Sequence, residues 1–103
     1  KLEEMDDKFM QKLDIARMVA KIPFIATSGF RSEIWEQEQG RDGTSSHTKG
    51  LAIDLKAQDG LTRYKIINSL LSVGLNRIGI GKNLIHVDMD KDKASNVIWH
   101  YYG

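Results

Sequence analysis

Two short segments with alternating side chains constrain this fold most, because each places carboxylate or imidazole side chains on one face only. In residues 51–55, Asp54 lies on the face opposite to the aliphatic side chains. Residues 84–89 alternate in the same way, with His86 and Asp88 on one face and aliphatic residues on the other. If these two segments are paired strands, Asp54 and His86 extend from the same face of a sheet.

A third candidate, His47, precedes the first of these strands in a loop rich in Gly, Ser, Thr, Asp and Lys, residues 40–50. Two imidazoles and one carboxylate are the ligand types of a catalytic zinc site, which keeps a fourth position open. The chain contains no cysteine, so a metal must be held by nitrogen and oxygen. By itself, each residue has an ordinary structural interpretation, as a satisfied histidine or a capping aspartate, and spacing alone is a loose indication.

Length and composition limit the possible classes of protein. At 103 residues the chain forms a single domain, and 41% hydrophobic and 28% charged residues are ordinary for a globular protein. A net charge of +1 gives no field that favours nucleic acid, and no apolar run approaches the ~18 residues of a membrane span. We therefore expect no binding to nucleic acid and no membrane-spanning helix. We also expect a monomer.

Periodicity predicts an α+β domain with a mostly antiparallel sheet and flanking helices. Apolar residues at steps of three and four predict helices over residues 2–20 and 61–73, and a short helix is expected over 32–39. Short apolar or alternating runs predict strands, whereas residues 76–81 resemble a Gly-punctuated connection that includes at most a short strand. The expected strands are 24–27, 51–55, 84–89 and 97–102.

The expected helices have specific apolar faces. The first stripe consists of Leu2, Met5, Phe9, Leu13, Ala16 and Ala20, and Pro23 is expected to stop this helix. The second stripe consists of Tyr64, Ile67, Leu70 and Leu71.

Three ordered motifs resemble one known family. Ser45-x-His47-x-x-Gly50-x-Ala52-x-Asp54 is similar to the SxHxxGxAxD signature of the zinc D-Ala-D-Ala carboxypeptidase family, whose wider group includes lysostaphin-type peptidases and the hedgehog signalling domain. Residues 27–32, Thr-Ser-Gly-Phe-Arg-Ser, resemble that family's TSGYRS segment, and residues 85–88 resemble its HVD strand. The motifs span residues 27–88 in the family's order.

The resemblance implies that residues 1–103 form one zinc peptidase domain with the hedgehog/D-Ala-D-Ala peptidase-like fold. It makes His47, Asp54 and His86 the ligands of Zn²⁺. It also implies that Arg31 grips the substrate or stabilises the oxyanion, since a guanidinium donates two parallel hydrogen bonds. The alternative for this arginine is a surface salt bridge to a nearby glutamate.

The general base is where the sequence departs from the family pattern. Many relatives carry Glu or Asp three residues before the last histidine, but this chain has Asn83 there, which cannot accept a proton from water. Asp88 is the first candidate for the base, although it is equally suited to orienting His86, and His100 is the second. Asn83 then fits a donor to the substrate or the oxyanion.

The function implied is hydrolysis of peptidoglycan stem peptides or cross-links by a small bacterial or phage enzyme, as a carboxypeptidase or an endopeptidase. Such a protein acts on the cell wall, either secreted or periplasmic, or phage-encoded and released at lysis. One alternative is a non-catalytic zinc-binding or partner-binding module of the same fold, and another is a small binding domain without metal. Trp99 is expected in the core or the cleft wall.

Overall fold

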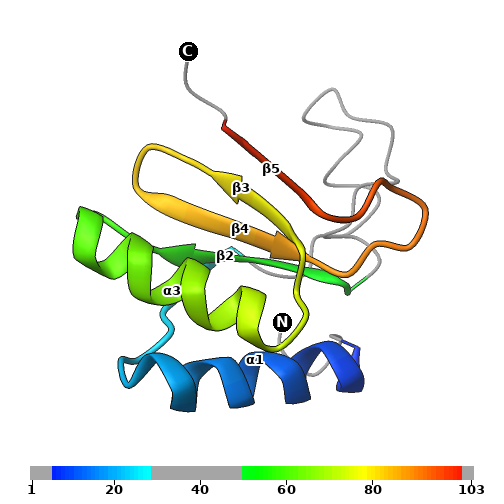
Figure 1. The fold of residues 1–103 in the computed structure, drawn as a ribbon, viewed down its shortest axis with the longest axis horizontal. Coiled ribbons are helices and arrows are strands. Elements are labelled where there is room, and N and C mark those ends of the chain that lie inside the picture. Colours follow the sequence, from blue (N-terminus) through cyan, green and yellow to red (C-terminus); the bar gives the residue numbers. More distant parts are fainter. Residues whose placement is uncertain (1–5, 29–49, 101–103) are drawn as a thin grey trace.

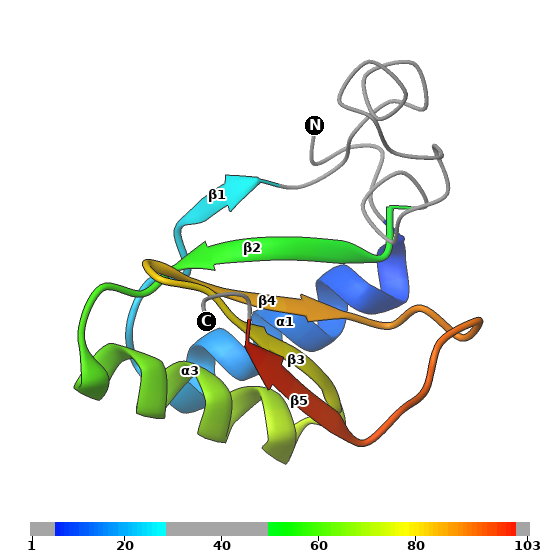
Figure 2. The same ribbon diagram turned by 90° about the horizontal axis from the view of Figure 1, so that it is seen from above.

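A five-stranded sheet packed on one face by two helices makes up the described part of the chain (Figures 1 and 2). The computed structural model describes residues 6–28 and 50–100. The elements are α1 (Asp7–Ala20), β1 (Ala26–Ser28), β2 (Ala52–Lys56), α3 (Gly60–Ser72), β3 (Arg77–Ile80), β4 (Leu84–Asp88) and β5 (Val97–His100). The predicted helix over 32–39 lies outside the described residues.

The sheet has the strand order β1-β2-β4-β3-β5. All neighbouring strands are antiparallel except β3 and β5, which are parallel. The predicted α+β class with a mostly antiparallel sheet is therefore confirmed. Residues 77–80, which resembled a connection, form the strand between β4 and β5. The order places β2 and β4 side by side in the interior of the sheet.

Helix α1 begins and ends with defined caps. The Asp6 carboxylate accepts a hydrogen bond from the Phe9 backbone N–H at 3.0 Å, and Lys21 adopts a left-handed conformation at φ 59°. The helix therefore ends at Ala20, three residues before Pro23, so the proline follows the cap Lys21 instead of making the stop. The predicted stripe is confirmed for its described members Phe9, Leu13, Ala16 and Ala20, all of which are buried.

We expect Asp6→Ala to destabilise the fold by about 1 kcal/mol, because the first turn of α1 loses its side-chain cap. Urea unfolding measures the change. Asp14→Ala is the matched control, since this aspartate lies mid-helix in an exposed pair with Arg17 and its removal should cost less than about 0.5 kcal/mol. Equal stability of the wild type and Asp6→Ala would contradict the capping role.

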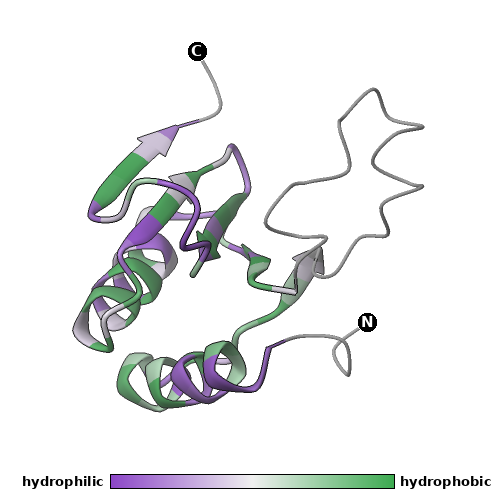
Figure 3. Cartoon of the chain, turned by 90° about the vertical axis from the view of Figure 1, so that its right-hand side faces the viewer, coloured by the Kyte–Doolittle hydropathy of each residue, from purple (hydrophilic) through white to green (hydrophobic). Residues whose placement is uncertain are grey.

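The predicted apolar face of α3 is partly wrong. Tyr64 and Leu71 are 66% and 45% exposed, whereas Ile66 and Leu70 are buried. The helix carries apolar residues on more than one side, and packing against α1 and the sheet selects the side that contains Ile66. Figure 3 shows green apolar segments and purple polar segments on both helices.

No helix in the described ranges is long and apolar enough to span a membrane.

The two faces of the sheet have different chemistry, as the alternation predicted. Aliphatic side chains of β2, β3 and β4 form one core with both helices, and its largest buried members are Phe9, Leu55, Ile66, Leu70, Leu75, Ile78, Ile85 and Val87. Asp54 and His86, at the intervening positions, contact each other on the opposite face. The helices thus stabilise one face of the sheet, and the other carries the polar residues.

Candidate metal centre

Asp54 and His86 lie directly opposite each other on β2 and β4. His86 Nδ1 is 2.9 Å from Asp54 Oδ1, and the two residues are only 5% and 7% exposed. Directly opposed residues of an antiparallel pair are the closest cross-strand neighbours on a sheet face. Strand register alone therefore brings together two of the three residues that the sequence motifs single out.

Asp88 contacts the other side of the His86 ring. Its carboxylate Oδ2 is 2.7 Å from His86 Nε2, since alternate residues of β4 share a face and both side chains lean toward each other. The second oxygen, Oδ1, accepts hydrogen bonds from Arg77 Nε at 2.6 Å and from the Asp90 backbone N–H at 3.1 Å. With Asp88 2% exposed, both oxygens of this buried carboxylate have protein partners.

The two carboxylates set the protonation of this cluster. Burial lowers the pKa of His86, but its hydrogen bonds to Asp54 and Asp88 outweigh burial, so that the pKa is raised above 6.5. Burial likewise raises the pKa of Asp88, but hydrogen bonds from His86, the Asp90 backbone and Arg77 outweigh it, and the pKa is lowered. Without metal, a proton on each ring nitrogen is therefore favoured, because carboxylates only accept hydrogen bonds.

The donor set fits a zinc ion between Asp54 and His86. Two donors about 2.0–2.1 Å from a tetrahedral zinc ion lie about 3.3 Å apart, close to the 2.9 Å between His86 Nδ1 and Asp54 Oδ1. A zinc ion bound at Nδ1 would leave the Nε2–H to donate to Asp88, the arrangement that commonly orients a metal-binding imidazole. Within residues 6–28 and 50–100, no group of three such side chains has the arrangement of a metal site.

Two of the predicted site residues lie outside the described residues, namely His47 and Arg31. The other two candidates, His100 and Asn83, belong to β5 and to the turn before β4. His100 of β5 is paired with Ile80 of β3 and follows Trp99, which contacts His86. Alternation therefore directs His100 to the opposite face of the sheet. Asn83 lies exposed in the turn before β4.

Sequence reasoning missed Arg77 and the role of Gly79. Arg77 contacts Asp88 from β3, and Gly79 is the register partner of both His86 and Trp99. The missed signal was alternation within residues 77–80, where Arg77 and Gly79 alternate with two isoleucines. The indole of Trp99 lies 5.6 Å from the His86 ring, between centroids.

Comparison with known proteins gives one match. The sequence model of the peptidase M15 family matches residues 3–90, which include every site residue discussed above except Trp99 and His100. No curated protein and no solved structure shows a significant match. The match covers most of the chain and both strands of the candidate centre.

Proposed function

The chain belongs to the peptidase M15 family, and we propose that it is a zinc-dependent peptidase that hydrolyses peptide bonds of peptidoglycan. The observation that carries the proposal is the buried His86 ring, with Asp54 at one nitrogen and Asp88 at the other. This is the environment of a metal-binding imidazole with its orienting carboxylate. Family membership supports a peptide substrate and a metallopeptidase reaction.

The proposed roles follow from these contacts and from the family motifs. Asp54 and His86 hold the metal together with His47, and Asp88 keeps the His86 ring in one orientation. Arg31 binds the substrate carbonyl or carboxylate. A bound zinc ion would supply Lewis-acid polarisation of the peptide carbonyl and activation of the attacking water.

We assign Asp88 the role of orienting His86 rather than that of a general base, because both of its oxygens are occupied by protein donors. A carboxylate that accepts from Arg77 and from His86 has a lowered pKa, which makes it a weaker base. The alternation of β5 argues against His100 as the proton carrier.

Hydrolysis of purified sacculi tests the proposal. Zinc-loaded protein is expected to release new amino groups and smaller muropeptides, detected by amine labelling and mass spectrometry, and chelator-treated protein is expected to release none. A D-Ala-D-Ala peptide in a parallel reaction distinguishes a carboxypeptidase from an endopeptidase. Intact sacculi and peptides in the presence of zinc-loaded protein, with a wall amidase active beside it, would contradict peptidase function.

A second candidate is a zinc-binding module without turnover. The observation that favours it is Asn83, an exposed amide in the turn where many relatives carry an acid. Tight zinc binding without hydrolysis of any wall fragment would support this module.

Zinc affinity is expected to fall as the pH is lowered, because zinc and a proton compete for His86. The pKa of His86 is raised above 6.5 in the folded protein, so the competition begins at higher pH than for an ordinary imidazole. The affinity should change by up to about tenfold per pH unit for each proton displaced. Titration against a chromophoric chelator at several pH values measures it.

The folding stability of the metal-free protein is expected to depend on pH in the opposite direction to the zinc affinity. A raised pKa contributes stability that is present at low pH and is lost as the pH rises through the folded-state pKa. Stabilisation by added zinc should therefore increase with pH in thermal unfolding. A zinc affinity that is constant across the imidazole range would contradict the assignment of His86 as a ligand.

A further inference from the structure

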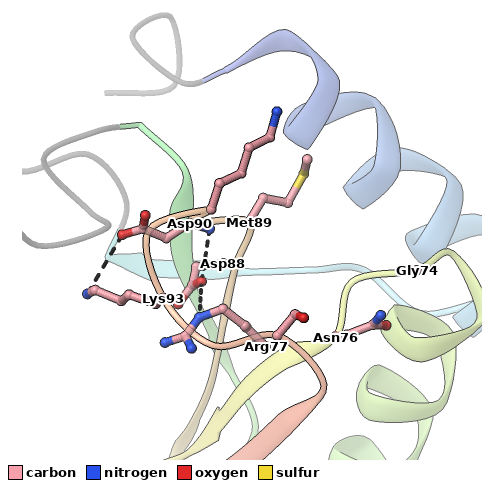
Figure 4. A pocket seen from close by; sticks show the side chains of 9 residues that line it. Gly74, Asn76, Arg77, Asp88, Met89, Asp90 and Lys93 are labelled. Carbon is pink, nitrogen blue, oxygen red and sulfur yellow. Dashed lines mark hydrogen bonds and ion pairs between the residues drawn. The ribbon is translucent and has the colours of Figure 1, made fainter.

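A continuous line of contacts runs from Arg77 through Asp88 to His86. Arg77 Nε donates to Asp88 Oδ1 at 2.6 Å, and the other oxygen of the same carboxylate is 2.7 Å from His86 Nε2 (Figure 4 shows the first contact). Arg77 belongs to β3, and Asp88 and His86 belong to β4. Arg77 and Asp88 are register partners across these two strands. The arginine thus reaches the candidate metal ligand through a single side chain.

The ion pair between Arg77 and Asp88 has a desolvation cost, because both side chains are largely buried. The side chains of Arg77 and Asp88 are 13% and 1% exposed, so both charges are largely removed from water. A buried pair is often no more stabilising than apolar residues of the same volume, because desolvation offsets the attraction. Stability alone therefore gives little reason for an arginine here, and the contacts of its guanidinium indicate a positional role.

The guanidinium is fixed from three sides. Besides Asp88, it donates through Nη1 to the Ala94 carbonyl, and its central carbon lies 4.9 Å from the centroid of the Trp99 ring. A planar fork that donates in two directions and stacks on an aromatic face is specific to arginine, and lysine cannot reproduce it. Arg77 therefore holds the Asp88 carboxylate in one orientation.

Trp99 completes the support of the imidazole. Its indole contacts the His86 ring, with 5.6 Å between centroids and 54° between planes. The space for the indole exists because residue 79 is glycine, where a Cβ atom would lie 2.8 Å from Trp99 Cε2. Arg77 and His86 thus contact the same indole, and the arginine is linked to the ring by packing as well as through Asp88.

We propose that Arg77 is a positioning residue for the metal centre, which holds the Asp88 carboxylate and the Trp99 indole so that the His86 ring presents Nδ1 toward Asp54. This proposal rests on the zinc site of the proposed function. In this role Arg77 acts through Asp88 and Trp99. Its effect should therefore appear in metal affinity and in the geometry of the bound ion, and should depend on Asp88.

The test is a double-mutant cycle on zinc affinity, with Arg77→Gln, Asp88→Ala and the combined variant. Arg77→Gln is expected to weaken zinc binding by about 10- to 100-fold, as loss of supporting residues commonly does. In the Asp88→Ala background the same substitution should change the affinity by less than about threefold, since the carboxylate is gone and only the contact of Arg77 with Trp99 remains. The visible spectrum of the cobalt-substituted protein should shift in Arg77→Gln, reporting altered coordination.

Controls separate positioning from folding. Arg17→Gln removes an exposed arginine–aspartate pair on α1 and should leave zinc affinity and the cobalt spectrum unchanged. Arg77→Lys keeps the charge without the fork, so its affinity should lie between those of the wild type and Arg77→Gln. If Arg77→Gln does not fold, Arg77→Lys and the comparison in the Asp88→Ala background still test the proposal.

Two results would overturn it. A zinc affinity of Arg77→Gln within twofold of the wild type would show that Arg77 has no positioning effect, and equal losses in both backgrounds would show that it acts independently of Asp88. Either result leaves the zinc peptidase proposal intact. A wild-type protein that binds no zinc would instead contradict both proposals.

Discussion

His86→Ala is expected to abolish zinc binding and peptidase activity together. The substitution removes one proposed ligand and leaves the buried carboxylates of Asp54 and Asp88 without the ring that lies between them. We expect the loss of zinc affinity to exceed the approximately 100-fold that removal of a supporting residue costs. Calorimetric titration with zinc measures the affinity, and release of amino groups from sacculi measures the activity.

His100→Ala is the matched control for this prediction. Strand alternation places His100 on the other face of the sheet, so this variant should bind zinc with wild-type affinity. Circular dichroism shows whether each variant is folded before the comparison is made. Wild-type zinc affinity in folded His86→Ala would show that the metal, if present, is held elsewhere.

Asp88→Ala is expected to weaken zinc binding and activity in parallel, by about 10- to 100-fold. The reason is that the His86 ring loses the acceptor at Nε2, and Arg77 is left without its buried partner. Activity measured at saturating zinc should recover much of the loss, because an orienting residue acts on the occupancy and geometry of the site. Steady-state kinetics over a range of free zinc separates the two effects.

The general-base role predicts a different pattern for the same variant. Zinc affinity would stay at the wild-type value while kcat falls and is not restored by excess metal. That outcome would support Asp88 as the general base, the role for which it was the first candidate in the sequence analysis. The two patterns differ in zinc affinity, which is measured without substrate.

Local patterns in the sequence were sufficient to predict the strands of the candidate centre. Alternation in residues 51–55 and 84–89 correctly placed Asp54 and His86 away from the aliphatic core. The steps of three and four in the first helix correctly predicted buried Phe9. These predictions succeed because burial of one face imposes its period directly on the chain.

Features set by tertiary packing could not be predicted in the same way. Local alternation does not indicate that β3 lies between β4 and β5, so the contact of Arg77 with Asp88 could not be predicted from it. In α3, two apolar faces compete, and packing against α1 and the sheet decides that Ile66 is buried and Tyr64 is exposed. The assignment of His47 and Arg31 still depends on the family motifs.

The zinc content of the purified wild-type protein tests the central claim most directly. After exposure to zinc and removal of the excess, elemental analysis should find about one zinc ion per chain. A chain that retains no zinc after this treatment, while circular dichroism shows it to be folded, would contradict a metal centre at Asp54 and His86.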